Sequence, residues 1–471
     1  MRFDIILDLL KRYSVFAIIV VLCLTILFLF GYFVIYKRLM HGDKKLNKKN
    51  ILLAIIGLFY LLVVFCAVFM NRNNVTDYSV QNLFSSYKSA WYTCSAQAWR
   101  NIVLNILLFV PFGILLPLLS QKTDKPYFVI PIGAASSLII EAIQYIFKIG
   151  IFEFDDVLNN TVGVILGYCV YRMFSAIKNK AVTPKKVIIC LLPFLIVIGT
   201  FSGIYAAYRI QPYGNLYVSD YEKHNMKNTK IICDTAISDK STTKNIYRAK
   251  DYTTSDAIKQ AKCYFQKSNI EVDYKSYVIE NDTLKLNSVD GKYHFSMDLT
   301  NGTYNFQNED LFQVYTNEVP DTSYTEDEIR NILKEYSVFP PVNSELTVNE
   351  NSYYEFSHTV RENDKSFCNG TIYCYLFNDD VLGQIDNNMV NLNKYTTENI
   401  MSKKDAVNLI KQGKFYSGEY DFENSTIQIN SIELTYLSDS KNYYQPIYYI
   451  KASLTNSKVQ EIELFIPALK K

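Results

Sequence analysis

The apolar residues of this chain are concentrated before Ile210, and this uneven distribution limits the folds that are open to it. Six apolar segments precede that point, at about 14–36, 51–70, 102–119, 127–147, 157–174 and 187–208. Each is close to the roughly 20 residues that an α-helix needs to cross a bilayer, and the fifth is near the lower limit. From about residue 211 to 471 the chain is polar and rich in Tyr, Asn, Ser and Thr. We therefore predict a polytopic α-helical membrane bundle of about six transmembrane helices, followed by a separate polar domain.

The first apolar segment follows Arg2, Lys11 and Arg12, as the apolar region of a signal peptide would. A signal peptide has a shorter apolar region that ends in small residues at a cleavage site. This segment instead runs over residues 14–36 and ends in a basic cluster. We predict a retained transmembrane helix.

The charges of the loops predict an orientation. The loop after the first helix contains one acid, Asp43, and a basic cluster formed by Lys37, Arg38, Lys44, Lys45, Lys48 and Lys49. Cytoplasmic loops carry an excess of Lys and Arg, so we expect this loop, and those around Lys125 and Lys185, in the cytoplasm. The N-terminus and the polar domain then lie outside the cell membrane, although Lys11 and Arg12 favour the opposite side for the N-terminus.

Polar side chains occur within the third, fourth and fifth apolar segments or at their edges. They are Asn101, Asn105, Glu141, Gln144, Asp155, Asp156 and Asn160. A carboxylate at the centre of a membrane helix costs roughly 2.5–3.5 kcal/mol on insertion scales, so such residues usually have a function. Members that are three or four residues apart share a helix face. The predicted topology places all of them in one layer near the outer surface, which is our candidate site.

Each of these polar residues also has a structural interpretation. Asp155 and Asp156 can cap the fifth helix, because carboxylates there accept backbone N–H groups and favour the positive end of the helix dipole. Asn101 and Asn105 can join neighbouring helices by hydrogen bonds. Structure explains Glu141 least, because it lies well inside its helix, where a cap is not needed.

Glycine and proline residues indicate where helices meet. Gly163 and Gly167 continue the polar stripe of the fifth helix, and small residues there let a neighbouring helix approach closely. Pro111 and Gly113 are expected to interrupt the third helix, which a membrane tolerates only where neighbours satisfy the freed backbone groups.

Three ordered motifs resemble those of the VanZ-like family. The first, N-x-x-x-N-x-x-x-F-x-P-x-G, consists of Asn101, Asn105, Phe109, Pro111 and Gly113, and the second, I-E-x-x-Q, of Ile140, Glu141 and Gln144. The third, E-F-D-D-V-L-N-N-T-V-G, runs from Glu153 to Gly163 and is followed by Gly167 and Tyr168. The family usually has Asp at the position of Glu153.

The resemblance covers about residues 50–175 and implies a bacterial cell-envelope membrane protein. The member that gives the family its name is associated with low-level resistance to the glycopeptide antibiotic teicoplanin. The resemblance implies no particular reaction, so whether the chain is an enzyme stays open.

We expect four parts in the chain. They are residues 1–50 with the first transmembrane helix and its basic loop, 51–175 as the VanZ-like membrane domain, 176–210 with the last transmembrane helix, and 211–471 as an extracytoplasmic domain.

In the part from 211 to 471, alternating runs at 293–297 and 426–430 predict strands. Capping boxes at Thr253, Thr325 and Ser402 predict the starts of three helices. An α+β domain is expected, and the spacing allows repeated helix-plus-strands modules. Its layout resembles small extracytoplasmic modules of cell-wall regulators and peptidase propeptides.

The polar domain shows no sequence pattern of a hydrolase or a metal site. His224, His294 and His358 are scattered and are expected on the surface, and no nucleophile elbow, H-E-x-x-H or Gly-rich phosphate loop is present. The spacing of the nine cysteines gives no zinc signature. We therefore expect neither a metal nor a cofactor, and the disulfide pairing stays open.

Three functions remain open. In the first, the outer polar layer binds an anionic or amide-bearing ligand such as a glycopeptide or a peptidoglycan precursor, because a phosphate would instead require Arg or Lys. In the second, Glu141 and Asp156 are the acid and base of an intramembrane enzyme that acts on a lipid-linked substrate. In the third, the polar residues only hold the bundle, and residues 211–471 bind an envelope protein.

Membrane lipids are partners under each of these hypotheses. Nucleic acid is not expected, because the net charge is only +2 and no basic patch interleaved with aromatic residues is present.

Overall fold

The computed structural model describes residues 48–69, 80–119, 124–233, 239–280, 282–312, 320–349, 353–360, 367–377, 380–456 and 459–470. The predicted first transmembrane helix, residues 14–36, and almost all of the basic loop after it lie outside these ranges. The chain divides into two compact units, Met1–Pro212 and Tyr213–Lys471.

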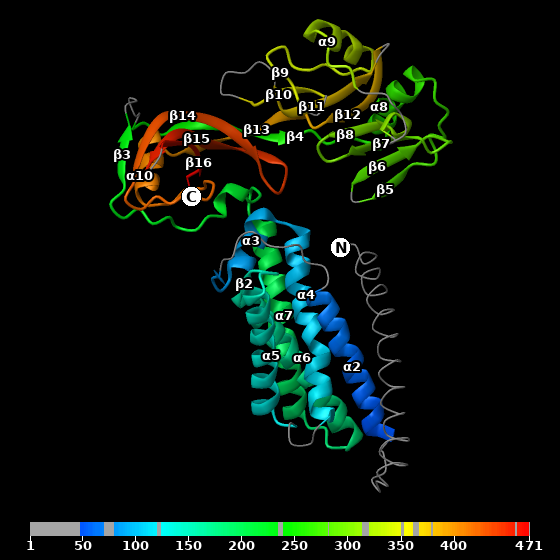
Figure 1. The fold of residues 1–471 in the computed structure, drawn as a ribbon, viewed down its shortest axis with the longest axis vertical. Coiled ribbons are helices and arrows are strands. Elements are labelled where there is room, and N and C mark those ends of the chain that lie inside the picture. Colours follow the sequence, from blue (N-terminus) through cyan, green and yellow to red (C-terminus); the bar gives the residue numbers. More distant parts are fainter. Residues whose placement is uncertain are drawn as a thin grey trace. The chain divides into compact units, whose positions relative to one another are not determined.

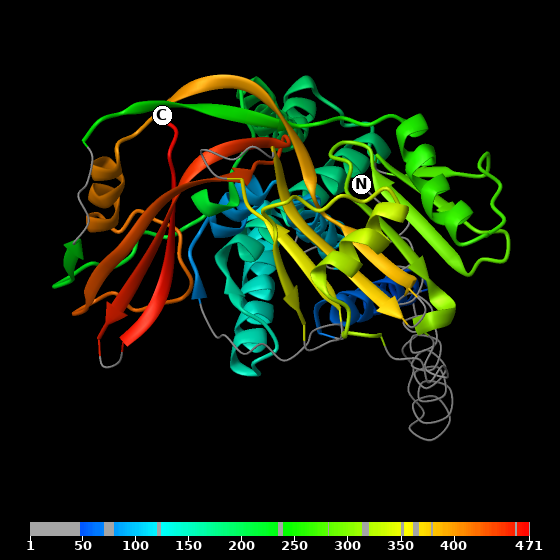
Figure 2. The same ribbon diagram turned by 90° about the horizontal axis from the view of Figure 1, so that it is seen from above.

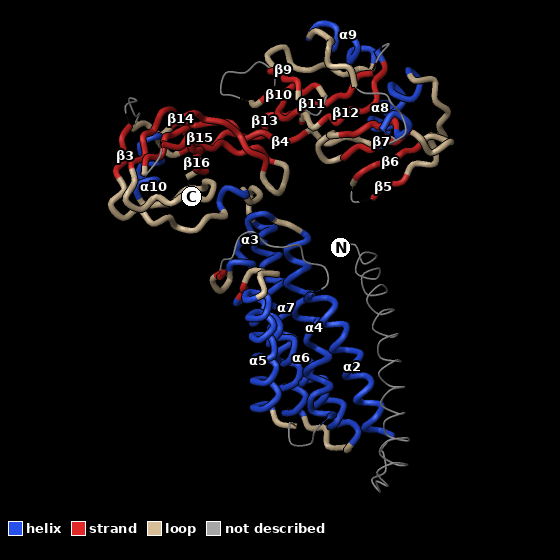
Figure 3. Tube along the Cα trace, viewed as in Figure 1, coloured by secondary structure: helices blue, strands red, loops and turns tan. Residues whose placement is uncertain are grey.

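The first unit contains five long helices among its described residues (Figures 1 and 3). They are α2 (Lys48–Phe69), α4 (Ala96–Leu119), α5 (Pro126–Ile146), α6 (Phe154–Lys178) and α7 (Pro184–Ile210). The short helix α3 (Ser85–Thr93) and the two-residue strands β1 (Val80–Gln81) and β2 (Phe152–Glu153), which pair in parallel, accompany them.

Three of the long helices, α4, α5 and α7, are long and apolar enough to cross a membrane. α6 overlaps the predicted segment 157–174, but its first turn contains Asp155 and Asp156 and its last turn contains Lys178. The number of six transmembrane helices therefore stays a prediction. The predicted interruption of the third helix is wrong, because α4 continues through Pro111 and Pro117.

α4 and α6 run in the same direction and touch through their backbones. A Cβ atom added to Gly163 of α6 would lie 2.0 Å from the carbonyl oxygen of Ile106 in α4, and one added to Gly167 would lie 2.0 Å from that of Val110. Only glycine permits so close an approach, which confirms the predicted role of this stripe. The connection at 147–153 reverses the chain, so α5 runs opposite to α6. The start of α4, the end of α5 and the start of α6 thus lie at one end of the bundle.

The second unit is an α+β domain whose described strands form one 14-stranded sheet. The strands are β3 (Lys230–Cys233), β4 (Thr242–Ala249), β5 (Val278–Glu280), β6 (Thr283–Asn287), β7 (Tyr293–Asp298), β8 (Tyr304–Asn308), β9 (Glu345–Val348), β10 (Tyr354–His358), β11 (Cys368–Phe377), β12 (Val381–Asn387), β13 (Val390–Ile400), β14 (Thr426–Ser438), β15 (Tyr443–Thr455) and β16 (Val459–Pro467). Their main order is β3-β14-β15-β4-β13-β11-β12-β8-β7-β6-β5, with β16 beside β15 and with β10, then β9, beside β11.

Three helices of the second unit begin at the predicted caps. They are α8 (Thr254–Lys267), α9 (Glu326–Glu335) and α10 (Lys403–Lys411), and Thr253, Thr325 and Ser402 each form a reciprocal capping box with the acid three residues later. These predicted starts are confirmed. Each helix precedes a group of strands, which gives the unit a repeated helix-then-strands order. Two 3-10 helices, η3 (Tyr217–Ser219) and η4 (Glu309–Phe312), lie in the connections.

The second unit has two main hydrophobic cores. In one, Tyr264 and Phe265 of α8 and residues of α9 pack against the sheet from β6 to β12, around the fully buried Phe306. In the other, α10 packs against β14, β15 and β16 around Phe415. Figure 2 shows the two groups of strands, which β4 and β13 join. Helices therefore cover one face of each group.

One histidine contradicts the sequence interpretation. His358 is only 6% exposed, because the alternation of β10 places Tyr354, Phe356 and His358 on the same buried side. No disulfide bond joins any two of the eight cysteines among the described residues. Cys368 and Cys374 lie on the same strand, β11, so a hairpin disulfide between them is ruled out by their positions.

Candidate functional site

The polar residues at the start of α6 form two rows on different sides of the helix. Asp155 and Asn159 are four residues apart and form the first row, while Asp156 and Asn160 form the second. Asp155, Asn159 and Asn160 are almost completely buried. The two rows face different neighbours.

The first row holds the short helix α3 against α6. The fully buried carboxylate of Asp155 accepts the backbone N–H of Phe84 at 2.5 Å and that of Ser86 at 2.8 Å. Phe84 is the N-cap residue of α3 and has no polar side chain to cap the helix itself. A carboxylate at this position satisfies open N–H groups and favours the helix dipole. Asp155 therefore caps α3. The sequence pattern instead suggests that it caps α6, the helix that contains it.

Two further hydrogen bonds join α3 to this end of the bundle. The hydroxyl of Tyr87 donates to Oδ1 of Asn159, and the hydroxyl of Ser86 donates to Oε2 of Glu153 at 2.8 Å. Burial raises the pKa of Tyr87 to about 12, and the negative charges of Asp155 and Asp156 add to this effect. Tyr87 thus remains a protonated donor at neutral pH.

The second row lies between α4 and α5. Nδ2 of Asn105 in α4 donates to Oδ1 of Asp156, and Nδ2 of Asn160 donates to Oγ of Ser137 in α5 at 2.8 Å. Ser137 is fully buried. This row therefore connects the three helices that the sequence predicted to meet.

α5 contributes a matching row of buried polar residues. Ser137, Glu141 and Gln144 lie on one face of the helix, and Glu141 is 3% exposed. Oε2 of Glu141 accepts the backbone N–H of Glu153 at 3.2 Å, and Nε2 of Gln144 donates to the carbonyl oxygen of Val68 in α2 at 3.2 Å. The carboxylate of Glu141 therefore faces the protein interior.

Three amide atoms at this end of the bundle are buried without a hydrogen-bond partner among the described residues. They are Oε1 of Gln144, Nδ2 of Asn159 and Oδ1 of Asn160. An unpaired buried polar atom costs about 1–3 kcal/mol, so these atoms are suited to bond an incoming ligand or an ordered water. Two of them accept hydrogen bonds and one donates.

Six of the seven predicted site residues lie at this end of the bundle with buried or half-buried side chains. We call the set Asn105, Ser137, Glu141, Gln144, Asp155, Asp156, Asn159 and Asn160 the polar helix-end cluster. Asn101 is exposed on α4, and no hydrogen bond to the cluster places it with the others. Within the described part of the chain, no group of three His, Cys, Asp or Glu side chains is placed to hold a metal ion.

Sequence reasoning overlooked Ser137, Asn159 and Tyr87. Helical spacing could have found the first two, because Ser137 lies four residues before Glu141 and Asn159 lies four residues after Asp155. Tyr87 offered no such signal, because it is 72 positions from Asn159 and reaches it only through the packing of α3.

Comparisons with known proteins agree with the motifs. Residues 14–175 match the VanZ/LLP1 family. Protein VanZ of Enterococcus faecium is 29% identical over 135 residues, which cover 28% of this chain and 78% of that protein. A crystal structure of an uncharacterised protein from Eubacterium rectale aligns with 50% of this chain and 87% of that one, with 13% identity and a TM-score of 0.29.

Proposed function

Residues 14–175 match the VanZ/LLP1 family, and we propose that this bacterial envelope protein uses the polar helix-end cluster to bind an amide-bearing ligand. One observation carries the proposal. One amide atom in each of three residues is buried without a partner among the described residues: Oε1 of Gln144, Nδ2 of Asn159 and Oδ1 of Asn160. Helix packing alone does not account for polar atoms that are buried and unsatisfied.

The chemistry of the cluster suits a peptide. A peptide group offers both an N–H donor and a carbonyl acceptor, and the cluster presents acceptors at Gln144 and Asn160 and a donor at Asn159. The carboxylates of Glu141 and Asp156 add stronger, charge-assisted acceptors. Proteins hold phosphate mostly with Arg and Lys, which are not members of this cluster. We therefore propose the peptide stem of a peptidoglycan precursor as the ligand and tolerance of teicoplanin as the resulting phenotype.

Replacement of Glu141 by glutamine is expected to abolish the teicoplanin tolerance that the parent chain confers on a susceptible host. Glutamine keeps the size of the side chain and can still accept the N–H of Glu153, but it removes the charge offered to the ligand. The measurement is the minimum inhibitory concentration, with membrane abundance followed by immunoblot. Asn101→Ala, at an exposed position of the same motif region, is the control and should behave like the parent.

Two outcomes would contradict this proposal. Equal tolerance of the parent and the Glu141→Gln variant, both above the empty vector, would show that the charge of Glu141 is not needed for tolerance. Equal tolerance of the parent and the empty vector would show that this chain confers no teicoplanin tolerance. Titration of the purified full-length protein with a synthetic stem pentapeptide would then decide whether the cluster binds a peptide.

We also propose that the second unit lies outside the cell. The lysines of the α6–α7 connection support this orientation, because Lys178, Lys180, Lys185 and Lys186 are typical of a cytoplasmic loop. If α7 crosses the membrane, Tyr213–Lys471 then follow on the outer side.

A Val342→Cys variant is expected to react with a membrane-impermeant maleimide in intact cells. Val342 is 96% exposed in the second unit, so the new thiol is accessible wherever that unit is in contact with the reagent. Lys178→Cys, at the exposed end of α6, is the matched variant and should react only after the cells are permeabilised. The measured quantity is labelling above that of the parent chain. If Lys178→Cys is labelled in intact cells and Val342→Cys only after permeabilisation, the second unit lies in the cytoplasm.

A further inference from the structure

The sheet of the second unit has a face opposite to the one on which α8 and α9 pack. In β7, Phe295 and Met297 belong to the core beneath these helices, whereas His294 and Ser296 lie on the other side. The same alternation holds in the neighbouring strands, and the outward side chains there are partly or fully exposed. We call the outward side of β6, β7, β8, β10, β11 and β12 the polar sheet face.

The register of the strands arranges the outward side chains in rows. One row consists of Glu355, Tyr373, Asp386, Asn305, Ser296 and Lys285, which are paired in succession across six strands. The next row consists of Tyr375, Gln384, Gln307, His294 and Asn287. With neighbouring strands about 4.8 Å apart, the longer row extends for roughly 24 Å. None of these side chains is aliphatic.

A cluster of tyrosines lies at one end of the rows. The ring of Tyr353 lies 5.5 Å from that of Tyr373 and 5.3 Å from that of Tyr375, measured between centroids. All three side chains are only partly buried. A tyrosine ring offers an apolar surface for stacking and a hydroxyl group for hydrogen bonding.

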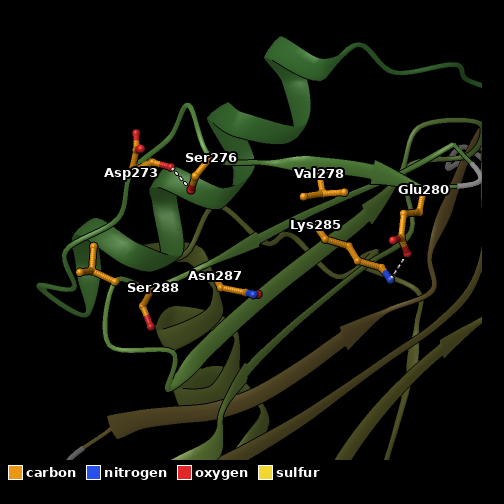
Figure 4. A pocket seen from close by; sticks show the side chains of 8 residues that line it. Asp273, Ser276, Val278, Glu280, Lys285, Asn287 and Ser288 are labelled. Carbon is orange, nitrogen blue, oxygen red and sulfur yellow. Dashed lines mark hydrogen bonds and ion pairs between the residues drawn. The ribbon is translucent and has the colours of Figure 1, made fainter.

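A cavity of about 440 Å³ lies at the other end of the rows (Figure 4). Its lining includes Asp273, Ser276, Glu280, Lys285, Asn287 and Ser288. Lys285 and Asn287 are also the last members of the two rows, so the polar sheet face leads into the cavity. Nζ of Lys285 lies 2.9 Å from Oε2 of Glu280, so the positive charge at this end is paired.

The longer row of the polar sheet face contains two carboxylates, those of Glu355 and Asp386, and one ammonium group, that of Lys285. The carboxylate of Asp386 accepts hydrogen bonds from Nδ2 of Asn305 and, at 2.7 Å, from Nε2 of Gln384. The charge of Lys285 is paired with Glu280, so the face has no excess of positive charge to attract a polyanion. A peptide that extends a sheet binds along the edge of a strand and not across a face, so the rows do not suit that mode either.

We propose that the polar sheet face binds a neutral oligosaccharide, and that the N-acetylated glycans of the envelope are its ligands. Amide side chains both donate and accept hydrogen bonds, as the hydroxyl and acetamido groups of such sugars do. The apolar faces of sugar rings stack on tyrosine rings, for which Tyr353, Tyr373 and Tyr375 are placed. This binding is independent of the polar helix-end cluster, because every residue involved belongs to the second unit.

Titration of the detergent-purified full-length protein with a tetramer of N-acetylglucosamine tests the proposal. The parent is expected to bind saturably, and Tyr373→Ala is expected to raise the dissociation constant by at least tenfold. Tyr395→Ala is the matched control, because Tyr395 is an exposed tyrosine on β13 outside the face, and it should leave the affinity unchanged. Gln307→Glu changes charge without changing volume and should weaken binding even if Tyr373→Ala disturbs folding.

Three results would overturn the proposal. They are the absence of tetramer binding by the parent, an equal loss of affinity in the Tyr395→Ala variant, and unchanged affinity in both the Tyr373→Ala and the Gln307→Glu variants. Binding of a polyanion such as polyglutamate in preference to the tetramer would also contradict a neutral ligand. Neither the presence nor the absence of tetramer binding bears on the Glu141 experiment, so the two proposals can fail separately.

Discussion

Replacing Gly163 with alanine is expected to destabilise the membrane unit strongly, whereas the same change at Gly203 should have no such effect. A Cβ atom at Gly163 would lie 2.0 Å from the carbonyl oxygen of Ile106, so α4 and α6 would have to separate. Overpacking a core with side chains costs about 1–3 kcal/mol, and here the obstacle is backbone that cannot rotate away. We therefore expect a loss above about 3 kcal/mol.

Gly203 is a matched control because it also lies within a long helix. In α7 a Cβ atom at this position meets nothing within 4 Å, and alanine favours the helix over glycine by roughly 1 kcal/mol. The measurement is the temperature at which half of the monodisperse protein is lost from size-exclusion chromatography in detergent. For Gly163→Ala a decrease on the order of 10 °C corresponds to the expected loss. Equal midpoints for both variants would show that α4 and α6 are not packed as described.

Asp155→Asn is expected to destabilise the bundle, while Asp156→Asn should leave its stability close to that of the parent. The carboxylate of Asp155 accepts two backbone N–H groups at the start of α3, and an amide can replace only one of its two oxygens. Hydrogen bonds to charged groups contribute roughly 1.5–3 kcal/mol each, so the loss should be of that order. At position 156 an amide oxygen can still accept the hydrogen bond of Asn105.

The two aspartates are adjacent in sequence, so the two variants carry the same substitution at neighbouring positions of the same helix and can be compared directly. Thermal midpoints in detergent measure stability, and the teicoplanin assay measures function. We expect Asp155→Asn to lower membrane abundance, and Asp156→Asn to keep abundance while it loses function. If Asp156→Asn instead unfolds the protein and Asp155→Asn does not, the assignment of the two rows of α6 is reversed.

Part of the candidate site was predictable, because a polar residue inside an apolar membrane segment is easily recognised in the sequence and is usually buried against other helices. Glu141 and Gln144 interrupt an apolar segment, and both are nearly completely buried. The helix-face rule also explains why Asp156 and Asn160 share one row. It fails for Asn101, which is exposed although it lies four residues before Asn105, because a helix face does not specify how far toward the helix end the neighbours extend.

The role of Asp155 could not be predicted, because its partners are distant in sequence. Phe84 and Ser86 lie 71 and 69 positions away, and the helix that they open shows no strong apolar period. A carboxylate in the first turn of a helix usually suggests a cap for that helix, since the pattern is local. Only the packing of α3 shows that the cap belongs to another helix.

The sequence by itself determined what depends on neighbours along the chain. The starts of α8, α9 and α10 follow from capping boxes, whose donors and acceptors are three residues apart. The long helices of the first unit follow from runs of apolar residues, and the VanZ-like motifs follow from fixed spacings.

The tertiary structure alone decided which polar atoms are paired and which strands are adjacent. It separates Asp155, which caps α3, from Asp156, which meets Asn105 across 51 positions. It also aligns Tyr373 of β11 with Asp386 of β12 and Asn305 of β8 in one row of the polar sheet face. The physical reason is that hydrogen bonds and side-chain contacts depend on distance in space, which a sequence specifies only through the packing of the whole chain.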